Sequence, residues 1–567
     1  MDAIIMICII AAIMLAFFLL GLRSAKDEEK KFCKKASKEF GDAPSKRYKS
    51  KYDRISGYHE KHSGDYFVDD ITWNDLSMGD VFDRINYCES FAGEEYLYYM
   101  LRNPLLNEDD SFSKMEEELK ALSQSENERI KLKLLFHKIG KSNKYSIYDY
   151  LDLLNEVNVK SNGVHYCMLA MMILSVLLAI FWNFTVGFLI LLMLVAVNIV
   201  SYFREKAKIE PYLITFSYVI RLLNQGDMLI KAGSDIFSDE IKDLSQNTSL
   251  MKDFSKGSWI LMSGAQMNGR GNPLDMLSDY VRMITHVDLI KFNNMLKKLS
   301  ERLDNVDNIV SIMGRIDAVL SICYYRASLG EKFCTPTFEK SSDVENSVYS
   351  IEDGYHPLLK EPVDNSVKLK KGILLTGSNA SGKSTFLKMC AINAIFAQSI
   401  HTCLAKEYRA PMYRIYSSMA LKDDLSFGDS YYMVEIKSLK RILDSAEESD
   451  KAPVLCFIDE VLRGTNTVER ISASTKVLEY FAKKKVCCFA ATHDIELSSL
   501  LSKCYEIYHF EGNMDGDDVH FDYRLKEGPA TNRNAIKLLK TIGYQDSIVK
   551  EAEHMAETFE NEGVWMI

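Results

Sequence analysis

A glycine-rich loop between a short apolar run and a helix-compatible segment places the strongest constraint on how this chain folds. Residues 376–385 read Thr-Gly-Ser-Asn-Ala-Ser-Gly-Lys-Ser-Thr, after the run Ile373 to Leu375 and before the segment Phe386 to Gln398. A strand, a glycine turn and a helix in that order form a P-loop, whose backbone N–H groups and helix N-terminus bind phosphate. We therefore expect an α/β nucleotide-binding domain with a nucleoside triphosphate as its ligand.

Each residue type in this loop suits one part of the ligand. Glycine at positions 377 and 382 permits the tight turn that points N–H groups inward. Lys383 reaches the β- and γ-phosphates, and the Ser384 hydroxyl can bind Mg²⁺. ATP and Mg²⁺ are the expected ligands. The residues expected to hold the nucleotide are Gly377, Ser378, Asn379, Ala380, Ser381, Gly382, Lys383, Ser384 and Thr385.

Two further apolar runs end in the polar groups that phosphoryl transfer needs. Val454 to Ile458 is typical of a buried strand and is followed by Asp459 and Glu460. Asp459 suits Mg²⁺ and Glu460 suits a base that positions or activates water. Val486 to Ala491 is a second such run, and His493 follows it. We expect His493 to sense the γ-phosphate, and we assign Glu460 and His493 as catalytic. Downstream, residues 505–510 and 519–525 flank a polar turn and predict a β-hairpin.

Taken together, these motifs resemble those of the MutS family of mismatch-repair ATPases, in particular membrane-anchored relatives without the mismatch-recognition domain. The phosphate loop of that family normally runs Gly-Pro-Asn-Met-Gly-Gly-Lys-Ser-Thr. Residues 423–435 resemble its signature segment, which approaches the nucleotide of the partner subunit, and residues 459–467 resemble its Walker B end and dimer-crossing loop. Residues 521–542 are similar to its closing strand and dimerisation helices. The resemblance implies an ATPase and a homodimer, and it alone implies DNA as a partner.

The chain also departs from the family pattern. Ser-Phe-Gly-Asp-Ser at 426–430 stands where the family usually carries Ala-Ser-Gly-Arg-Ser, so Phe427 and Asp429 replace a hydroxyl and a cation. A solvated loop without a role at the partner's site is the alternative interpretation of this segment. Before Asp70 there is no stretch long enough for the family's mismatch-reading and connector domains, and there is no Phe-x-Glu wedge near the N-terminus. We therefore expect no direct reading of mispaired bases.

Upstream of the P-loop, the resemblance continues into the family's core and lever region. Residues 70–76, 93–97 and 101–105 resemble the segment that opens the core domain, and residues 313–338 and 354–358 resemble the return to the ATPase. Between them, apolar residues recur at steps of three and four, which predicts one long amphipathic helix. Its apolar seam is Leu289, Phe292, Leu296, Leu299, Leu303, Val306, Val310 and Met313.

Three apolar segments are candidates for membrane spans. Ala3 to Leu22 is an uninterrupted apolar run, for which a cleaved signal peptide is the competing interpretation. Tyr166 to Trp182 and Val186 to Tyr202 form a second apolar block, split at Asn183 to Thr185. Each half is about 25 Å long as a helix, which just spans a bilayer. A helical hairpin buried in the core domain is the alternative.

Charge next to these segments predicts their orientation. Lysine and arginine gather on the cytoplasmic side of membrane proteins. We therefore expect a multi-pass protein of the cell membrane, with the N-terminus outside and the ATPase in the cytoplasm. The flanking cations are Arg23, Lys26, Lys30, Lys31, Lys34, Lys35, Arg204, Lys206 and Lys208.

Overall composition adds two exclusions. Lys+Arg 69 against Asp+Glu 79 gives a net charge of −10, so no global electrostatic attraction to nucleic acid is expected. The 12 cysteines form no Cys-x-x-Cys pair, so no zinc site is expected, and Cys390, Cys487 and Cys488 are expected to be reduced and packed.

The predicted architecture is an α/β P-loop NTPase domain of the ABC/MutS type, preceded by an all-α core and lever region with three transmembrane helices. The predicted function is a membrane-anchored, MutS-like ATPase in which ATP switches a homodimer and its lever. The first alternative is an ATP-driven membrane switch or remodelling protein whose partner is lipid or another membrane protein. A less favoured one is an ABC-type transporter subunit, for which the Leu-Ser-Gly-Gly-Gln motif is absent. The predicted divisions are an anchor (1–24), a basic juxtamembrane linker (25–65), the first part of the core (66–164), a transmembrane hairpin (165–203), the returning core and lever (204–340) and the ATPase with dimerisation helices (341–567).

Overall fold

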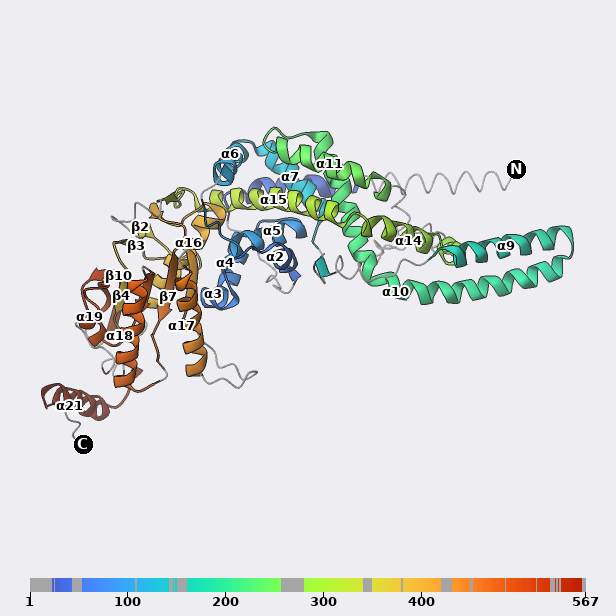
Figure 1. The fold of residues 1–567 in the computed structure, drawn as a ribbon. Coiled ribbons are helices and arrows are strands. Elements are labelled where there is room, and N and C mark those ends of the chain that lie inside the picture. Colours follow the sequence, from blue (N-terminus) through green and yellow to red (C-terminus); the bar gives the residue numbers. More distant parts are fainter. Residues whose placement is uncertain are drawn as a thin grey trace.

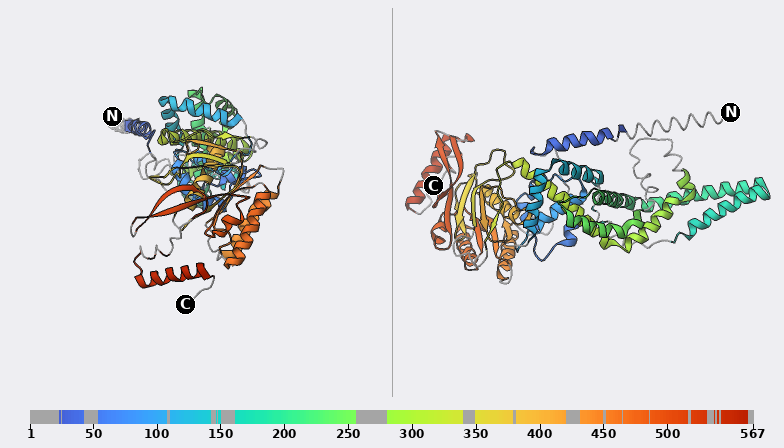
Figure 2. Two further views of the ribbon diagram at one scale, coloured as in Figure 1. Left: turned by 90° about the vertical axis from the view of Figure 1, so that its left-hand side faces the viewer. Right: turned by 90° about the horizontal axis from the view of Figure 1, so that it is seen from above.

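The fold is elongated, with an α/β domain at one end and an apolar helical hairpin at the other (Figure 1). A helical core lies between them, and the view from above in Figure 2 shows the same order. The computed structural model describes residues 23–24, 26–42, 54–107, 110–141, 146, 148–149, 161–255, 280–339, 349–378, 381–419, 431–448, 452–463, 465–484, 486–515, 518–530, 536, 539 and 542–562.

The helical core is built around one long helix, α15 (Leu303–Leu329). Two glycines let helices approach it closely: a Cβ at Gly93 would lie 2.3 Å from Asp317 Oδ2, and one at Gly314 would lie 2.6 Å from the Ala92 carbonyl. Asp317 is fully buried and accepts hydrogen bonds from the Ser90 hydroxyl and N–H at 2.6 and 2.8 Å. The N-terminal part of this core consists of α2 (Gly57–His62), α3 (Asp70–Asp75), α4 (Met78–Ile85), α5 (Phe91–Arg102), α6 (Asp110–Gln124) and α7 (Glu126–Ile139).

The predicted long amphipathic helix is two helices rather than one. α14 (Val287–Ser300) ends before Glu301, and α15 begins after Arg302, whose N–H bonds to the Leu299 carbonyl three residues back. The seam itself is confirmed, because its members are buried on both helices apart from the partly buried Leu303. Apolar periodicity reports the buried face and not the continuity of the backbone, so the prediction of a single helix was wrong. α11 (Ser238–Ser255) packs against both helices.

Within the described residues, two helices are long and apolar enough to cross a membrane. α9 (Gly163–Phe181) and the start of α10 (Phe184–Ala232) form a hairpin, and 11% of each apolar window is buried. At its tip, Phe181, Trp182 and Phe184 are 81%, 79% and 70% exposed. The alternative of a hairpin buried in the core is therefore wrong. The third expected span, residues 3–22, lies outside the described residues. α10 continues without a break into the core, where it contacts α7, α11 and α15.

Residues 26–39 form a helix that docks on the core, where the sequence analysis expected a linker. Phe32 stacks on His137 with ring centroids 3.9 Å apart, and the Tyr324 hydroxyl donates to the Ala36 carbonyl at 3.1 Å. The Arg129 guanidinium lies 3.7 Å from the Phe40 ring centroid. In Figure 2, this dark blue helix begins on the side of the molecule where the hairpin lies. Its apolar side chains, rather than its lysines, decide where it packs.

A six-stranded sheet with the order β10-β9-β4-β8-β7-β6 forms the centre of the α/β domain. α16 (Lys383–Ile400) packs on one face of the sheet, the face to which Leu455 and Phe457 of β7 belong. α17 (Tyr431–Glu447) and α18 (Thr467–Lys483) pack on the other face, to which Cys456 and Ile458 of β7 belong. The strands are β4 (Ile373–Thr376), β6 (Arg414–Ser418), β7 (Val454–Asp459), β8 (Cys487–Ala491), β9 (Glu506–Asp515) and β10 (Asp518–Glu527).

Most of the strand pairing in this sheet is parallel, and only β10 runs antiparallel, against β9, which confirms the predicted hairpin. Cys390, Cys487 and Cys488 are buried as expected. The structured part of the chain contains no group of three or more His, Cys, Asp or Glu residues placed to hold a metal. A smaller sheet with the order β1-β5-β2-β3, the short α19 (Glu496–Leu500) and the C-terminal α21 (Asp546–Glu562) complete the domain; the smaller sheet comprises β1 (Thr337–Phe338), β2 (Tyr349–Gly354), β3 (Asn365–Leu369) and β5 (Glu407–Ala410).

Candidate nucleotide-binding site

Three neighbouring parallel strands bring the predicted site residues together. β8 pairs with β4 on one side and with β7 on the other, so the carboxyl ends of all three meet at one edge of the sheet. The P-loop follows β4, Glu460 follows β7 and His493 follows β8. Ligands of open parallel sheets bind at this edge. The structure therefore places the three separate motifs at one edge of the sheet.

The backbone of the phosphate loop depends on its two glycines. Gly377 has a φ of +141° and Gly382 a φ of +109°, conformations that favour glycine. A Cβ at Gly377 would also lie 2.5 Å from the Phe510 carbonyl oxygen. Ser381 is 1% exposed and lines the site next to Gly382. Asn379 and Ala380 lie outside the described residues.

Lys383 crosses the mouth of the loop. Its ammonium donates hydrogen bonds to the carbonyls of Gly377 at 2.7 Å and Ser378 at 2.8 Å. Burial lowers the pKa of Lys383 below its usual range, while the charges of Asp459 and Glu460 oppose that shift. The cation is thus held beside two carboxylates, where a phosphate group would compete for it.

Ser384 and Asp459 are in direct contact. The Ser384 hydroxyl donates to Asp459 Oδ2, so a hydroxyl oxygen and a carboxylate oxygen from two motifs 75 positions apart meet at one point. Mg²⁺ prefers oxygen ligands of this kind and is usually held by one or two protein groups together with substrate phosphates. The residues present therefore fit Mg²⁺, as expected.

Glu460 is held by two basic side chains. His493 Nε2 lies 2.5 Å from Glu460 Oε1, and Arg463 Nη1 lies 2.8 Å from Glu460 Oε2. His493 Nδ1 lies 3.1 Å from the Gly377 carbonyl, so the imidazole bridges the P-loop and the carboxylate. Arg463 is an additional site residue; the sequence analysis placed it within the dimer-crossing loop without giving it this contact.

The main chain at Glu460 fixes the direction of its side chain. The residue has a φ of +63°, and its N–H donates to the Ala491 carbonyl at 2.9 Å. The hydrogen bond with His493 and the contact with Arg463 lower the pKa of Glu460 to about 2, against the opposing effect of burial. In this arrangement the carboxylate is ionised at neutral pH and suits holding a water molecule better than taking its proton.

A cavity of about 510 Å³ adjoins these groups. Its apolar wall includes Phe386, Met389 and Phe510, which suits a nucleoside base. His356 lines the same cavity; burial and nearby Lys388 lower the pKa of its imidazole to about 4, so the ring is neutral at pH 7. Its remaining lining residues are Gly354, Leu359, Glu361, Val363, Asn365, Ser381, Gly382, Lys383, Ser384, Thr385, Asp459, Glu460 and Tyr523.

Comparison with known proteins agrees with this geometry. Residues 373–560 match the family model of MutS domain V. The α/β domain is therefore similar to MutS domain V. DNA mismatch repair protein MutS of Persephonella marina is 30% identical over 270 residues, which cover 46% of this chain and 30% of that protein. The MutS of Aquifex pyrophilus is 27% identical over 290 residues, which cover 49% of this chain and 33% of that protein.

These relatives match about half of this chain, so the likeness to MutS is that of the part they cover. The chain spans about a third of the length of the curated MutS proteins it matches. Within the MutS-like domain, the sequence analysis missed His356, Tyr523 and the apolar wall of the cavity. His356 lies in the Gly-Tyr-His-Pro-Leu stretch at 354–358, interpreted as part of the return to the ATPase, and Tyr523 lies in residues 521–542, interpreted as the closing strand and dimerisation helices.

Some MutS-like motifs cannot be placed. Phe427 and Asp429 of the signature segment lie outside the described residues, as does Gly464 of the dimer-crossing loop. The loop is described again from Thr465, and Asn466 caps α18 by accepting a hydrogen bond from the Glu469 N–H at 3.0 Å. Most of the expected dimerisation region at 532–542 also lies outside the described residues.

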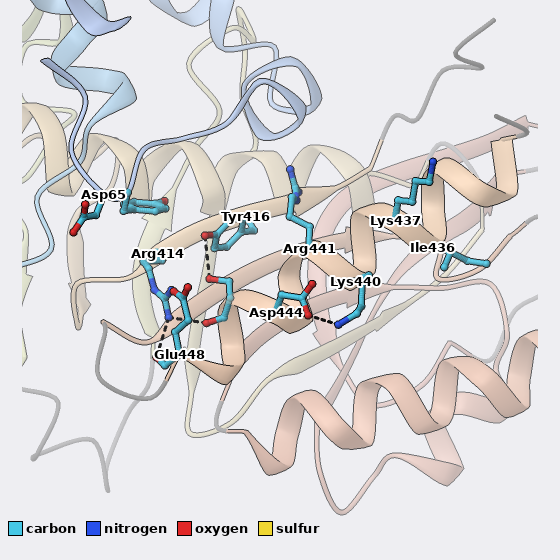
Figure 3. A pocket seen from close by; sticks show the side chains of 11 residues that line it. Asp65, Arg414, Tyr416, Ile436, Lys437, Lys440, Arg441, Asp444 and Glu448 are labelled. Atoms are coloured by element: carbon cyan, nitrogen blue, oxygen red, sulfur yellow. Dashed lines mark hydrogen bonds and ion pairs between the residues drawn. The ribbon is translucent and has the colours of Figure 1, made fainter. Parts of the chain in front are cut away.

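A second cavity of about 590 Å³ is lined by residues of β6, α17 and the start of the core segment. Figure 3 shows Tyr416 of β6 next to Arg441 of α17, Arg414 of β6 beside Glu448, and Asp65 coming from the core segment. Most of its charges are paired: Arg414 with Glu448, and Lys440 with Asp444. This cavity marks the junction between the core and the MutS-like domain rather than a second nucleotide site.

Proposed function

We propose that this protein is a membrane-anchored, MutS-like ATPase in which ATP binding pairs two nucleotide-binding domains and moves the helical core. One observation carries the proposal: the P-loop lysine, the Ser384–Asp459 pair and the Glu460–His493 pair converge on one cavity from three adjacent strands. Phosphoryl transfer requires this set of a phosphate-binding lysine, a metal site and a residue that orients the attacking water.

ATP and Mg²⁺ are assigned to specific residues. The nucleotide would be held by the loop residues 377–385 and its base by the apolar wall beside His356. Ser384 and Asp459 would hold Mg²⁺, which when bound neutralises charge on the β- and γ-phosphates. Lys383 would exchange its bonds to the loop carbonyls for bonds to phosphate oxygens, because a charged acceptor binds an ammonium more strongly than a carbonyl does.

Glu460 and His493 would act at the water molecule and at the γ-phosphate. Glu460 is ionised and close to the cavity, so it can accept a hydrogen bond from the attacking water. His493 contacts both the P-loop carbonyl at Gly377 and Glu460, so a phosphate entering the loop would compete with one of these contacts. We therefore assign to His493 the sensing of the γ-phosphate.

A homodimer is the proposed assembly. Residues 423–435 and 459–467 resemble the MutS segments that meet the partner's nucleotide, and a two-fold pair brings two copies of the same surface together. Each subunit would then complete the site of the other. The domains would pair only if nucleotide binds the paired state more tightly than the separate state.

The membrane would hold the end of the molecule opposite the ATPase. α9 and the start of α10 project there with their apolar side chains exposed, and residues 163–203 carry no Asp, Glu, Lys or Arg. With residues 3–22 this gives three spans, an N-terminus outside and the ATPase in the cytoplasm, the arrangement that the flanking cations favour. Lipid is the partner we assign to the hairpin.

A second candidate function is an ATP-driven membrane switch that does not bind DNA. The observation that favours it is the apolar surface at the end of the lever, because DNA binding depends on cations that neutralise phosphates. DNA is named in the MutS relatives alone, and the net charge of −10 offers no general attraction to it. The partner of such a switch would be lipid or another membrane protein.

Two measurements on the full-length protein in detergent test these proposals. Calorimetric titration with Mg²⁺-ATP and steady-state phosphate release should show binding and turnover, and a protein without ATP affinity would overturn the ATPase. Binding to duplex and mismatched DNA across a salt series separates the two candidates. A steep loss of affinity with salt would identify a DNA-binding protein, and no binding at low salt would favour the membrane switch.

A further inference from the structure

The outer edge of β6 is paired with side chains of the core instead of a strand. Among the described residues, β6 is the last strand of the six-stranded sheet and pairs only with β7. Successive residues of a strand point their N–H groups to alternate sides, so every second residue needs a partner away from β7. The core segment 66–75 supplies three: Ile415 N–H donates to the Tyr66 hydroxyl, Ser417 N–H to Thr72 Oγ1 at 3.1 Å, and Met419 N–H to Asp75 Oδ2 at 2.9 Å.

One arginine joins the same core segment to α17. Arg441 donates from Nη1 to Asp69 Oδ2 and from Nη2 to the Ser417 carbonyl, both at 2.6 Å. Asp69 also caps α3, because its Oδ1 accepts from the Thr72 N–H at 2.8 Å. The Arg441 side chain is 23% exposed and that of Asp69 is 25% exposed. Three elements, α3, β6 and α17, are therefore tied at one guanidinium, beside the cavity in Figure 3.

α17 continues from this junction to the catalytic loop. The helix runs unbroken from Tyr431 to Glu447 and carries Glu435, which is 3% exposed, close to its start. Glu435 Oε1 accepts from the Arg463 N–H at 3.1 Å, and the Arg463 side chain holds Glu460 at 2.8 Å. A shift of α17 would thus move the backbone of the residue that holds the catalytic carboxylate.

We propose that Asp69 and Arg441 are positioning residues for Glu460, acting through α17, Glu435 and Arg463. The inference rests on the proposed ATPase function and adds to it a route by which the core sets the rate of hydrolysis. Motion of the core relative to the sheet is transmitted to α17 through the Asp69–Arg441 hydrogen bond, because Asp69 caps α3 of the core and Arg441 belongs to α17. Packed elements and hydrogen bonds of this kind transmit displacement between sites.

The expected effect falls on turnover and not on nucleotide binding. Neither residue lines the nucleotide cavity, so the affinity for ATP should stay within about twofold of wild type in Asp69→Asn and in Arg441→Ala. Turnover should fall about five- to tenfold in each, as a misplaced catalytic group costs rate without binding. Asn at position 69 still caps α3, since Asn is as good an N-cap as Asp.

The number of ATP sites, measured beside turnover, gives a readout that separates positioning from loss of structure. A loss of folded protein would lower the number of ATP sites and the turnover together. Misplacement of Arg463 should instead lower the turnover per bound nucleotide and leave the number of sites unchanged in both variants.

A matched control and a double variant complete the experiment. Glu448 lines the cavity of Figure 3 and forms an ion pair with Arg414 within the ATPase domain, so Glu448→Gln should keep wild-type turnover. The variant with both Asp69→Asn and Arg441→Ala should be no slower than either single variant, because both remove one bond. Additive losses, an equal loss in Glu448→Gln, or wild-type turnover in the single variants would overturn the proposal.

Failure of this inference is distinguishable from failure of the proposed function. If Glu460→Gln retains turnover, the catalytic assignment of Glu460 is wrong, and Asp69 and Arg441 then have no catalytic group to position. If Glu460→Gln loses turnover while Asp69→Asn and Arg441→Ala keep it, the ATPase stands and only the positioning role is refuted. Arg441→Lys serves as a second variant. Its single ammonium keeps the positive charge but cannot reproduce both guanidinium hydrogen bonds, to Asp69 and to the Ser417 carbonyl, so we expect its turnover to lie between those of Arg441→Ala and wild type.

Discussion

Replacing Glu460 by Gln tests the chemical step of the proposed reaction. The substitution keeps the size of the side chain and its capacity for hydrogen bonds to His493 and Arg463, but it removes the negative charge. Lys383, Ser384 and Asp459 are untouched, so the affinity for Mg²⁺-ATP should stay within about threefold of wild type. Only the interaction with the attacking water is lost.

The size of the effect follows from the state of the carboxylate. A general base contributes about 10² to 10⁴ in rate, or roughly 3 to 5 kcal/mol of the barrier. The pKa of Glu460 is about 2, which makes it a poor proton acceptor at neutral pH. We therefore expect the lower half of that range, a fall in turnover of about 100- to 1,000-fold.

Steady-state phosphate release and equilibrium ATP binding, measured on the same preparation, check this expectation. Glu479→Gln is the matched control, because Glu479 lies on the outer surface of α18 and pairs only with Lys476 among the described contacts. It should behave as wild type. Turnover of Glu460→Gln within threefold of wild type, or a loss of ATP affinity as large as the loss of turnover, would refute the role given to Glu460.

Three further predictions test the phosphate site, the junction between core and ATPase, and the topology. Lys383→Ala should abolish measurable ATP binding in calorimetry, because its ammonium is the one cation placed across the described loop; retained affinity would move the phosphate site elsewhere. Burial acts to raise the pKa of Glu116, but the hydrogen bonds and charges of Arg326 and His401 outweigh it and lower that pKa from 4.5 to about 2. The contribution of this carboxylate to the stability of the fold is therefore present above pH 4.5 and is lost as pH falls toward 2. Because Glu116 is partly exposed, we expect that contribution to be on the order of 1 to 2 kcal/mol, and Glu116→Gln should be less stable at pH 7 but show a smaller loss on acidification in urea titrations. In sealed membrane vesicles with the cytoplasmic face inside, an added Asn183→Cys should react with an impermeant maleimide while Cys504 reacts only after permeabilisation; the reverse pattern would exclude the proposed orientation.

Several features of the fold and site were predictable because they depend on neighbours in the chain. The P-loop needs glycine at 377 and 382 for its positive φ angles, and the apolar runs around 373, 455 and 488 have the composition of buried strands. Parallel strands place their carboxyl ends at one edge, so the meeting of Ser384 with Asp459 followed from motif order alone. The length and apolarity of residues 163–203 likewise predicted exposed helices long enough to span a bilayer.

Other features were decided only by the tertiary structure. The helix at 26–39 docks through Phe32 and Ala36, and the break at 301–302 leaves the apolar seam unchanged, so neither has a local signature in the sequence. His356 and Tyr523 reach the nucleotide cavity from elements on either side of the P-loop. A sequence pattern reports which face of an element is buried, but it does not report what lies against that face.

The edge of β6 shows this difference most clearly. The sequence by itself determined the buried strands around 373, 455 and 488, but it did not predict β6, whose residues are buried apart from the partly buried Tyr416. It did not determine that Tyr66 would pair with the main chain of Ile415, 349 positions away, or that Arg441 would bind Asp69. Such bonds depend on how the helical core packs against the sheet, because a hydroxyl or a carboxylate satisfies a strand edge only when packing brings it within hydrogen-bond distance.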